Sequence, residues 1–322
     1  MIDVSIVIVN WNTRELLKQC LDSVCENITR VSYEIYVVDN ASTDGSEAMV
    51  AREFPRVKLI RNSANLGFAR ANNIAMRAAG GRFLLLLNSD TVISKGAIAG
   101  LMKTMEADPS IGIAGLQLLN GDGSLQNSIC NFPSLLTELT NKSLLRILLP
   151  SRYPGKEHRI RHPVQVDAII GSCMMVRREA VEQVGLLDED FFFFFEETDW
   201  CLRMRRAGWK VVFDPRYAIF HLQGKSAAQV NVRARIEYWR SRYTYFAKHH
   251  STVSQYALRT GLLIRLLISM AGGAACLAML FKGSARCDKL SLNAAIFYWH
   301  LKGCPADGGL AAQQPLVETD NA

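Results

Sequence analysis

The first ninety residues alternate short β-branched segments with segments of helical periodicity, and no other feature of the chain limits its fold as much. The expected strands cover residues 4–9, 35–38, 57–60 and 83–87, and the expected helices cover 13–25, 44–53 and 67–79. Strands and helices that alternate at this short spacing predict an α/β fold with a parallel, doubly wound sheet. Ligands of such sheets bind beyond the carboxyl ends of the strands.

Polar residues follow every one of the four expected strands. They form the sequences Asn10-Trp11-Asn12, then Asp39 to Asp44, then Arg61-Asn62 with Asn65-Leu66-Gly67, and finally Asn88-Ser89-Asp90. Each sequence alone is ordinary turn chemistry, but four of them at one sheet edge indicate a ligand site. Asp39 could accept a hydrogen bond from the N3–H group of a pyrimidine, and Asp90 could hold a divalent cation that neutralises a diphosphate. No GxGxxG motif follows the first expected strand and no GxxxxGK(S/T) motif exists, which excludes a dinucleotide loop and a P-loop.

Composition is that of a globular protein with an anionic partner. Apolar residues make up 49% and charged residues 21%, which excludes a disordered or collagen-like chain. The net charge of +7 indicates a negatively charged partner without saying whether it is phosphate, nucleotide or lipid. The eight cysteines form no CxxC pair and no zinc-type cluster, as expected of free thiols in a reducing cytoplasm. The opening MIDVSIVIVNWN has no basic region or cleavage site, so we expect a core strand there and not a signal peptide.

An acidic cluster follows a phenylalanine run in the second half of the chain. Glu196-Glu197-Thr198-Asp199 comes directly after five phenylalanines at 191–195. An apolar wall raises the pKa of a neighbouring carboxyl group, as acid–base catalysis often requires. A helix is expected over 200–207, so Thr198 and Asp199 could instead cap it while the acids favour its dipole. By the residues alone, this capping role is the better supported of the two.

In their order along the chain, the motifs resemble glycosyltransferase family 2, a family of inverting enzymes with the GT-A fold. The segments VSIVIVNWN, VVDNASTDGS, NLGFARANN and LLLLNSDT resemble its nucleotide-sugar-binding half. The segment from AIIGSCMMVRREAVEQVG to WKVVFDP, followed by HLQGKS, resembles the acceptor and catalytic half of the rhamnosyltransferase-like branch. That branch makes bacterial O-antigen and other cell-surface polysaccharides. The resemblance covers residues 3 to about 250, and the Asp-x-Asp metal motif of the family reads Asn88-Ser89-Asp90 here.

The resemblance implies an enzyme that depends on Mg²⁺ or Mn²⁺. Asp90 and His221 would hold the cation. Glu197 would be the general base, with Glu196 orienting the acceptor and Asp199 capping and positioning the helix. The residues implied for donor binding are Val9, Asn10, Asn12, Asp39, Asn65, Gly67, Asn72, Asn88, Ser89 and Lys225. The residues implied for acceptor binding are Gly171, Ser172 and Trp200.

Some of these residues have a structural alternative. His221 follows expected strands at 210–213 and 217–220, where a single histidine is more often a surface or core residue. Gly171 and Ser172 follow an expected strand at 166–170, and their small size suits either a sugar ring or close strand packing. Cys173 has no His or second Cys near it in sequence, so we expect no nucleophile there.

The chain is expected to divide into a nucleotide-sugar half (1–115), an acceptor half (116–250), an apolar helical segment (251–304) and a disordered tail (305–322). The basic loop 142–162 is either a solvated face or a contact for an anionic lipid. Residues 261–281 are apolar apart from Arg265, and basic residues flank them on both sides. This pattern favours a helix lying on an anionic membrane over a spanning helix, and a core or dimer helix is the alternative.

The sequence therefore predicts transfer of a sugar, with L-rhamnose from dTDP-rhamnose as the first candidate, to a lipid-diphosphate or glycan acceptor. A UDP-linked hexose or galactofuranose donor is the alternative within the family. A basic nucleic-acid-binding protein is the alternative outside it, and the acids beside the aromatic cluster oppose that function. We expect the enzyme in the cytoplasm, bound peripherally to the inner face of the plasma membrane. The donor, the acceptor and the oligomeric state do not follow from the sequence.

Overall fold

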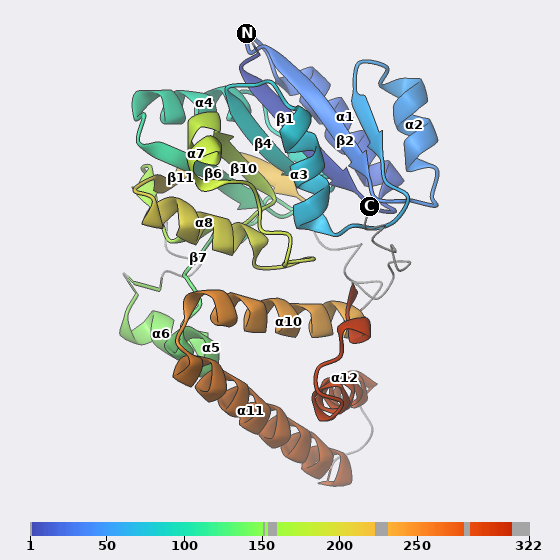
Figure 1. Ribbon diagram of the computed structural model, residues 1–322, viewed down its shortest axis with the longest axis vertical. Coiled ribbons are helices and arrows are strands. Elements are labelled where there is room, and N and C mark those ends of the chain that lie inside the picture. Colours follow the sequence, from blue (N-terminus) through green and yellow to red (C-terminus); the bar gives the residue numbers. More distant parts are fainter. Residues whose placement is uncertain (1, 151, 154–159, 223–230, 280–283, 311–322) are drawn as a thin grey trace, which may run out of the picture.

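The structure is a computed structural model that describes residues 2–150, 152–153, 160–222, 231–279 and 284–310 (Figure 1). At its centre is a mixed sheet with the strand order β3, β2, β1, β4, β10, β6, β11 and β5, in which β8 also pairs with β11. The strands are β1 (Val4–Asn10), β2 (Tyr33–Asp39), β3 (Lys58–Arg61), β4 (Phe83–Asn88), β5 (Thr91–Ile93), β6 (Ile111–Leu119), β8 (Val164–Gln165), β10 (Cys173–Arg177) and β11 (Lys210–His221). A separate antiparallel pair consists of β7 (Ile129–Cys130) and β9 (Ala168–Ile169).

The first four strands confirm the predicted parallel arrangement. β1 pairs in parallel with β2 and with β4, and β2 pairs in parallel with β3. The helices between them are α1 (Arg14–Asn27), α2 (Ser46–Glu53) and α3 (Phe68–Ala78), and each predicted boundary in this region lies within two residues of the observed one. Because these strands are parallel, the loops that follow them meet at one edge of the sheet.

Helices cover both faces of the sheet because side chains alternate along each strand. Ile6 and Leu85 belong to the core that the strands form with α1, α2 and α4 (Ala97–Ala107). Their neighbours Val7 and Leu86 belong to the core on the opposite face, with α3, α7 (Arg178–Val184) and α8 (Glu196–Arg206). Burial on both faces accounts for the nearly continuous apolar runs of β1 and β4.

The second half of the sheet adds antiparallel strands to this parallel core. β10 runs antiparallel to both β4 and β6, and β5 runs antiparallel to β11. The strands expected at 210–213 and 217–220 form the single strand β11, whose register shifts between Asp214 and Ala218. Of the strand expected at 166–170, residues 168–169 form β9, which pairs with β7, while β8 ends just before this range and pairs with β11. Because β10 is antiparallel to β4, the start of β10 lies beside the carboxyl end of β4.

Helices from two distant parts of the chain form a further layer below the sheet (Figure 1). They are α5 (Leu135–Leu139), α6 (Lys142–Leu148), α10 (Asn231–His249), α11 (Thr252–Met279) and α12 (Ser284–Leu301), so part of the predicted basic loop 142–162 is helical. Their apolar core includes Trp239 and Phe246 and extends to Phe191 and Phe195 at the sheet. Among the helices that the structure describes, none combines the length and the apolar character needed to cross a membrane.

The predicted disorder of the tail is wrong at its beginning. Residues 305–310 contain a 3-10 helix, η1 (Ala306–Gly308), and pack on α10 and α12. Trp299 Nε1 donates to the carbonyl of Pro305 at 3.0 Å, and the backbone N–H of Leu310 donates to Glu237 Oε2 at 3.1 Å. Glu237 lies 73 positions from Leu310 in sequence, so local composition gave no sign of that contact. Residues 311–322 lie outside the described part of the chain.

A buried ion-pair network joins α8 to α10. Asp199 is fully buried; its Oδ2 accepts from Arg203 Nε at 2.7 Å, and its Oδ1 lies 2.6 Å from His249 Nε2. Burial alone would raise the pKa of Asp199, but these two partners outweigh burial and hold the pKa below its ordinary value. The N-cap of α8 is Phe195 and no side chain caps the helix, so the predicted capping role of Thr198 and Asp199 is wrong.

We expect Asp199→Asn to lower the free energy of unfolding by about 3 kcal/mol, because it removes the buried carboxylate that Arg203 of α8 and His249 of α10 both contact. Urea denaturation of the purified protein measures the change. Asp190→Asn is the control, since Asp190 pairs with Lys248 of α10 at 2.5 Å but is exposed, and such pairs contribute little. If both variants lose the same small amount, the network does not join the two helices as described.

Candidate active site

The carboxyl ends of β1 and β2 form a rigid polar corner. Asn10 Nδ2 donates to Asp39 Oδ1 at 2.9 Å and to Ser42 Oγ at 3.0 Å, and Asp39 Oδ2 accepts from the backbone N–H of Ser42 at 2.9 Å. Asn12 has a left-handed backbone (φ +53°), and its Oδ1 accepts from the backbone N–H of Thr43 at 2.7 Å. Because these polar groups satisfy one another, the corner keeps its shape without a ligand.

A second set of amides lines the loop after β3. Asn40 Nδ2 donates to the carbonyl of Gly67 at 3.1 Å, and Asn62 Nδ2 donates to Asn40 Oδ1 at 2.8 Å. Asn65 Oδ1 accepts from the backbone N–H of Gly67 at 3.0 Å. Gly67 has φ +80°, and a Cβ atom there would lie 2.4 Å from the carbonyl oxygen of Phe192. Only glycine fits this position, so the loop lies directly against the phenylalanine run.

A cavity of about 380 Å³ opens between these loops and the phenylalanine run, a size typical of small-ligand sites. Seven of the residues predicted for donor or metal binding line it, namely Val9, Asn65, Gly67, Asn88, Ser89, Asp90 and His221. The cavity is also lined by seven residues that were not predicted from the sequence, namely Trp11, Asn40, Phe68, Phe192, Phe193, Phe194 and Leu310. Trp11 and Asn40 adjoin predicted residues and could have been included. Leu310 lies far in sequence from the other lining residues, and no motif near it predicts that it reaches the cavity.

Asp90 and His221 face each other at the wall of this cavity. Asp90 Oδ1 lies 3.3 Å from His221 Nε2. Pairing of β5 with β11 brings them together, because it places His221 opposite Thr91 and lets the backbone N–H of Leu222 donate to the carbonyl of Asp90 at 2.9 Å. Gln126 Oε1 lies 3.0 Å from the other ring nitrogen of His221, which fixes the orientation of the imidazole.

This pair fits a divalent cation that a ligand completes. Within the described residues, no three His, Cys, Asp or Glu side chains converge, so the protein does not enclose an ion by itself. Mg²⁺ is commonly held by one or two carboxylates together with substrate phosphates and water. Asp90 and His221 could supply the protein's share of such a site, and a diphosphate in the cavity would supply the rest.

The turn before β10 connects this pair to the acids of α8. Ser172 Oγ lies 3.4 Å from each ring nitrogen of His221, and the Ser172 carbonyl accepts from the backbone N–H of Asn88 at 3.0 Å. Gly171 lies against Glu197, since a Cβ atom on the glycine would be 3.5 Å from Glu197 Cβ. The same turn thus contacts the candidate metal ligand and the candidate base.

Burial raises the pKa of both glutamates at the start of α8. For Glu196, burial is the larger cause and the charge of Glu197 adds to it. For Glu197, burial outweighs the backbone N–H groups of Glu197, Thr198 and Gly171, which favour the ionised form. The Oε2 atom of each glutamate is buried without a hydrogen-bond partner in the described part of the chain. Two buried carboxylate oxygens without partners lower the stability of the folded protein, and unsatisfied groups of this kind are found mainly at functional sites.

The phenylalanine run that precedes the acids is strained. Phe194 and Phe195 adopt left-handed backbone angles (φ +73° and +71°), which are rare for bulky residues. Packing holds them there, because Ser241 Oγ of α10 donates to the carbonyl of Phe193 at 2.8 Å and the Tyr238 ring lies 5.4 Å from Phe194. Strain held by the surrounding structure is a further mark of a functional site.

The remaining predicted residues that the structure describes do not line the cavity. Asn10, Asn12 and Asp39 form the polar corner, and Gly171, Ser172 and the acids of α8 lie where described above, whereas Trp200 and Asn72 are held elsewhere. Trp200 is fully buried in the core, where its Nε1 donates to the carbonyl of Gly185 at 2.8 Å, so its predicted contact with an acceptor is wrong. Asn72 is buried in α3 and its Nδ2 donates to the carbonyl of Phe68 at 2.9 Å. Lys225 lies outside the described residues.

Comparison with known proteins agrees with this geometry. The model of the family "Glycosyl transferase family 2" matches residues 5–185, more than half of the chain. The chain belongs to glycosyl transferase family 2. The N-acetylglucosaminyl-diphospho-decaprenol L-rhamnosyltransferase of Mycobacterium tuberculosis is 27% identical to this glycosyltransferase over 236 residues, which cover 67% of this chain and 75% of that protein. The dTDP-rhamnosyl transferase RfbF of Shigella flexneri is 28% identical over 229 residues, which cover 70% of each chain.

A solved structure supports the fold. The mannosyltransferase PcManGT of Pyrobaculum calidifontis, in complex with GDP-Man and Mn²⁺, superposes with a TM-score of 0.56 at 18% identity. The match covers 93% of this glycosyltransferase and 86% of the mannosyltransferase. The predicted family, the predicted GT-A fold and the predicted enzyme class are thereby confirmed.

We expect Glu196→Gln to stabilise the glycosyltransferase at about pH 8 but not at about pH 4. Burial raises the pKa of Glu196 in the folded state, so folding loses stability as the pH rises through that pKa and the carboxyl group ionises. Below the ordinary pKa of 4.5 the group is protonated in both states, and glutamine offers no advantage. Thermal unfolding at the two pH values measures the difference.

The control for this experiment is Glu182→Gln, because Glu182 is an exposed residue of α7. This variant should unfold like the wild type at both pH values. A Glu196→Gln variant that is less stable than the wild type at about pH 8 would contradict the described cost of the buried charge.

Proposed function

We propose that this glycosyltransferase moves L-rhamnose from dTDP-rhamnose to a lipid-linked diphosphate acceptor, with inversion at the anomeric carbon, in the synthesis of a cell-surface polysaccharide. The observation that carries the proposal is the Asp90–His221 pair, 3.3 Å apart, which lines the same cavity as the polar ends of the parallel strands. The names of the two rhamnosyltransferase relatives support the donor and the class of acceptor.

The polar corner is suited to hold the nucleoside of the donor. Each oxygen of Asp39 makes one hydrogen bond within the corner and keeps a second lone pair, with which Asp39 would accept from the N3–H group of thymine. Asn88 and Ser89 line the cavity between this corner and Asp90, where the ribose and the diphosphate would lie. Asn10 and Asn12 act through the corner, by holding Asp39 and the loop after β2 in place.

Asp90 and His221 would hold Mg²⁺ or Mn²⁺, which when bound neutralises the charge on the departing diphosphate. The protein contributes the placement of these two side chains, which the pairing of β5 with β11 and the contact of Gln126 with His221 maintain. The Mn²⁺ in the complex of the similar mannosyltransferase supports a divalent ion in this class of fold.

Glu197 would take the proton from the acceptor hydroxyl as that oxygen attacks the anomeric carbon. One displacement from the face opposite the diphosphate inverts the configuration, so a single carboxylate base is enough. The raised pKa of Glu197 makes it a stronger base once it is ionised, and the adjoining phenylalanine run limits access of water. Gly171 and Ser172 would position the acceptor sugar, because they lie between Glu197 and His221.

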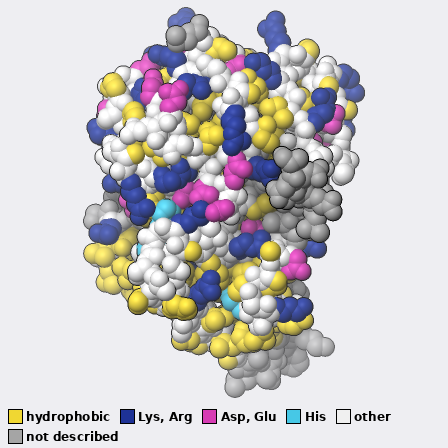
Figure 2. Space-filling view, in the orientation of Figure 1, with side chains coloured by type: hydrophobic (Ala, Val, Ile, Leu, Met, Phe, Trp, Pro, Cys, Tyr) yellow, Lys and Arg dark blue, Asp and Glu magenta, His cyan; other side chains and the backbone are white. Residues whose placement is uncertain are grey.

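The proposed halves are residues 1–115 for the donor and 116–250 for the acceptor, and the later helices would rest on an anionic membrane at its cytoplasmic face. Exposed apolar side chains of α6 and α11 support this contact: Ile147, Leu148, Ile264, Leu267 and Ile268. Figure 2 shows hydrophobic side chains gathering over the end of the molecule formed by these helices. Such a surface, flanked by basic residues, suits peripheral binding to anionic lipid.

We expect Glu197→Gln to lower turnover by roughly 100-fold or more while leaving the affinity for dTDP with Mn²⁺ nearly unchanged, because the variant keeps the shape and removes only the base. Product formation from dTDP-rhamnose with a lipid-diphosphate-GlcNAc acceptor gives the turnover, and calorimetry gives the affinity. Glu182→Gln should match the wild type in both. Wild-type turnover by Glu197→Gln would exclude Glu197 as the base.

A further inference from the structure

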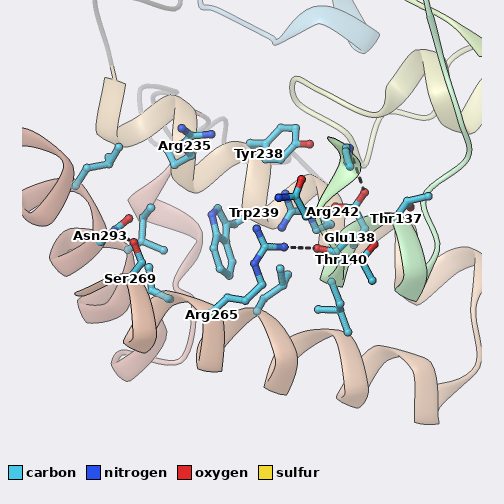
Figure 3. A pocket seen from close by; sticks show the side chains of 17 residues that line it. Thr137, Glu138, Thr140, Arg235, Tyr238, Trp239, Arg242, Arg265, Ser269 and Asn293 are labelled. Atoms are coloured by element: carbon cyan, nitrogen blue, oxygen red, sulfur yellow. Dashed lines mark hydrogen bonds and ion pairs between the residues drawn. The ribbon is translucent and has the colours of Figure 1, made fainter. Parts of the chain in front are cut away.

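A second pocket, larger than the active-site cavity, lies among the helices below the sheet. It has a volume of about 820 Å³ and is bordered by α5, α10, α11, α12 and the start of α6; we call it the helical pocket (Figure 3). Its lining holds four cationic side chains, Lys142, Arg235, Arg242 and Arg265, and an apolar wall that includes Leu262, Leu266, Leu292 and Ile296. Among the described lining residues, Glu138 is the one carboxylate.

The cations of the helical pocket are only partly neutralised. Arg242 Nε lies 3.1 Å from one oxygen of the Glu138 carboxylate, and Lys142 Nζ lies 3.8 Å from the other. Arg265 donates to the backbone carbonyl of Glu138 at 2.6 Å, which leaves its charge without an anion. Arg235 forms no ion pair with any described residue. The lining therefore carries a formal surplus of three positive charges, which repel one another unless an anion enters.

The shape of the lining indicates an amphiphilic anion. In Figure 3, Arg235 and Arg242 come from α10, and Arg265 extends from α11 toward Arg242 and Glu138, with Trp239 beside it. Leu262 and Leu266 of α11 and Leu292 and Ile296 of α12 also line the pocket, and Leu267 and Ile268 of α11 are exposed apolar side chains. A charged group at the arginines with a hydrocarbon chain along the apolar wall satisfies both parts of the lining.

The helical pocket adjoins the proposed acceptor side of the active site. Thr137 and Lys142 line both it and a smaller cavity of about 240 Å³. That smaller cavity is also lined by Ile170, next to Gly171, and by Gln126, which contacts His221. From the other direction, Tyr238 of the pocket packs 5.2 Å from Phe195, the residue before the acid pair.

We propose that the helical pocket binds the diphosphate group of an isoprenoid lipid and so holds the lipid-linked acceptor while its sugar reaches Glu197. Arg235, Arg242, Arg265 and Lys142 would bind the phosphate oxygens, and the apolar wall would hold the first part of the chain. The inference rests on the proposed function, because it names the site at which the acceptor of that reaction is held.

The test measures binding of farnesyl diphosphate to the full chain by tryptophan fluorescence, with Trp239 as an internal reporter. A chelator is present throughout, so that the diphosphate cannot bind at Asp90 and His221 through a cation. We expect Arg235→Gln/Arg265→Gln to bind this probe roughly tenfold to a hundredfold more weakly, because two charge-assisted contacts are lost. The matched control is Arg52→Gln/Arg56→Gln, two exposed arginines near the far end of α2, which should bind like the wild type.

Further ligands and variants in the same binding assay each test one part of the proposal. Inorganic pyrophosphate and farnesol should each bind at least tenfold more weakly than farnesyl diphosphate, because each lacks half of the ligand. Equal binding of pyrophosphate would overturn the assignment to a lipid, and equal binding of dihexanoyl phosphatidylglycerol would overturn the assignment to a diphosphate. Wild-type affinity in the arginine variant would overturn the site. Arg235→Gln alone is measured as well, because Arg235 is exposed and its loss should leave folding intact.

Binding of dTDP with Mn²⁺ separates this inference from the proposed function. The arginine variant should bind dTDP and Mn²⁺ like the wild type, and dTDP with Mn²⁺ should not displace farnesyl diphosphate. Displacement would place the probe in the donor site and overturn the inference. A wild-type protein that binds farnesyl diphosphate but not dTDP would refute the proposed donor and leave the helical pocket standing.

Discussion

Pairing of β4 with a parallel strand on one side and an antiparallel strand on the other is the constraint on which the rest of the structure depends. The parallel pairing with β1 brings the ends of both strands, at Asn10 and Asn88, to one edge. The antiparallel pairing with β10 brings the beginning of a strand to that same edge, so Ser172 lies within a backbone hydrogen bond of Asn88. Residues proposed to bind the donor and residues proposed to bind the acceptor thus meet through main-chain contacts, although more than eighty positions separate Asn88 from Ser172.

Desolvation is the second physical factor at this edge. The phenylalanine run and α10 bury the acids that begin α8, and the strained backbone of Phe194 and Phe195 is held by that packing. Buried carboxylates cost stability unless a ligand or a proton satisfies them. The network at Asp199 offsets part of this cost, because Arg203 and His249 both contact the Asp199 carboxylate and so join α8 to α10. The protein therefore places one paired acid, Asp199, and two incompletely paired acids, Glu196 and Glu197, within one helical turn.

The sequence was sufficient for those parts of the fold that depend on local pattern. Four parallel strands, three helices and seven cavity residues follow from alternation, from turn chemistry and from the order of the motifs. The sequence was not sufficient where contacts between residues far apart in the chain determine the structure. Asp199 looked like a helix cap because its partner His249 lies fifty positions away, and the start of α8 was missed because no propensity favours Phe195 as an N-cap. The helical pocket could not be predicted from the sequence either, because its arginines come from two helices and its carboxylate comes from a third.

The central claim of this account is that Asp90 and His221 hold the cation that binds the donor diphosphate at the sheet edge. Calorimetric titration of dTDP in the presence of Mn²⁺, and again with a chelator, tests it most directly in the wild type and in Asp90→Asn. We expect the chelator to weaken dTDP binding at least about tenfold in the wild type, and Asp90→Asn to bind weakly under both conditions, while the Asp122→Asn variant of an exposed residue behaves like the wild type. Metal-independent binding of dTDP with unchanged affinity in Asp90→Asn would contradict it.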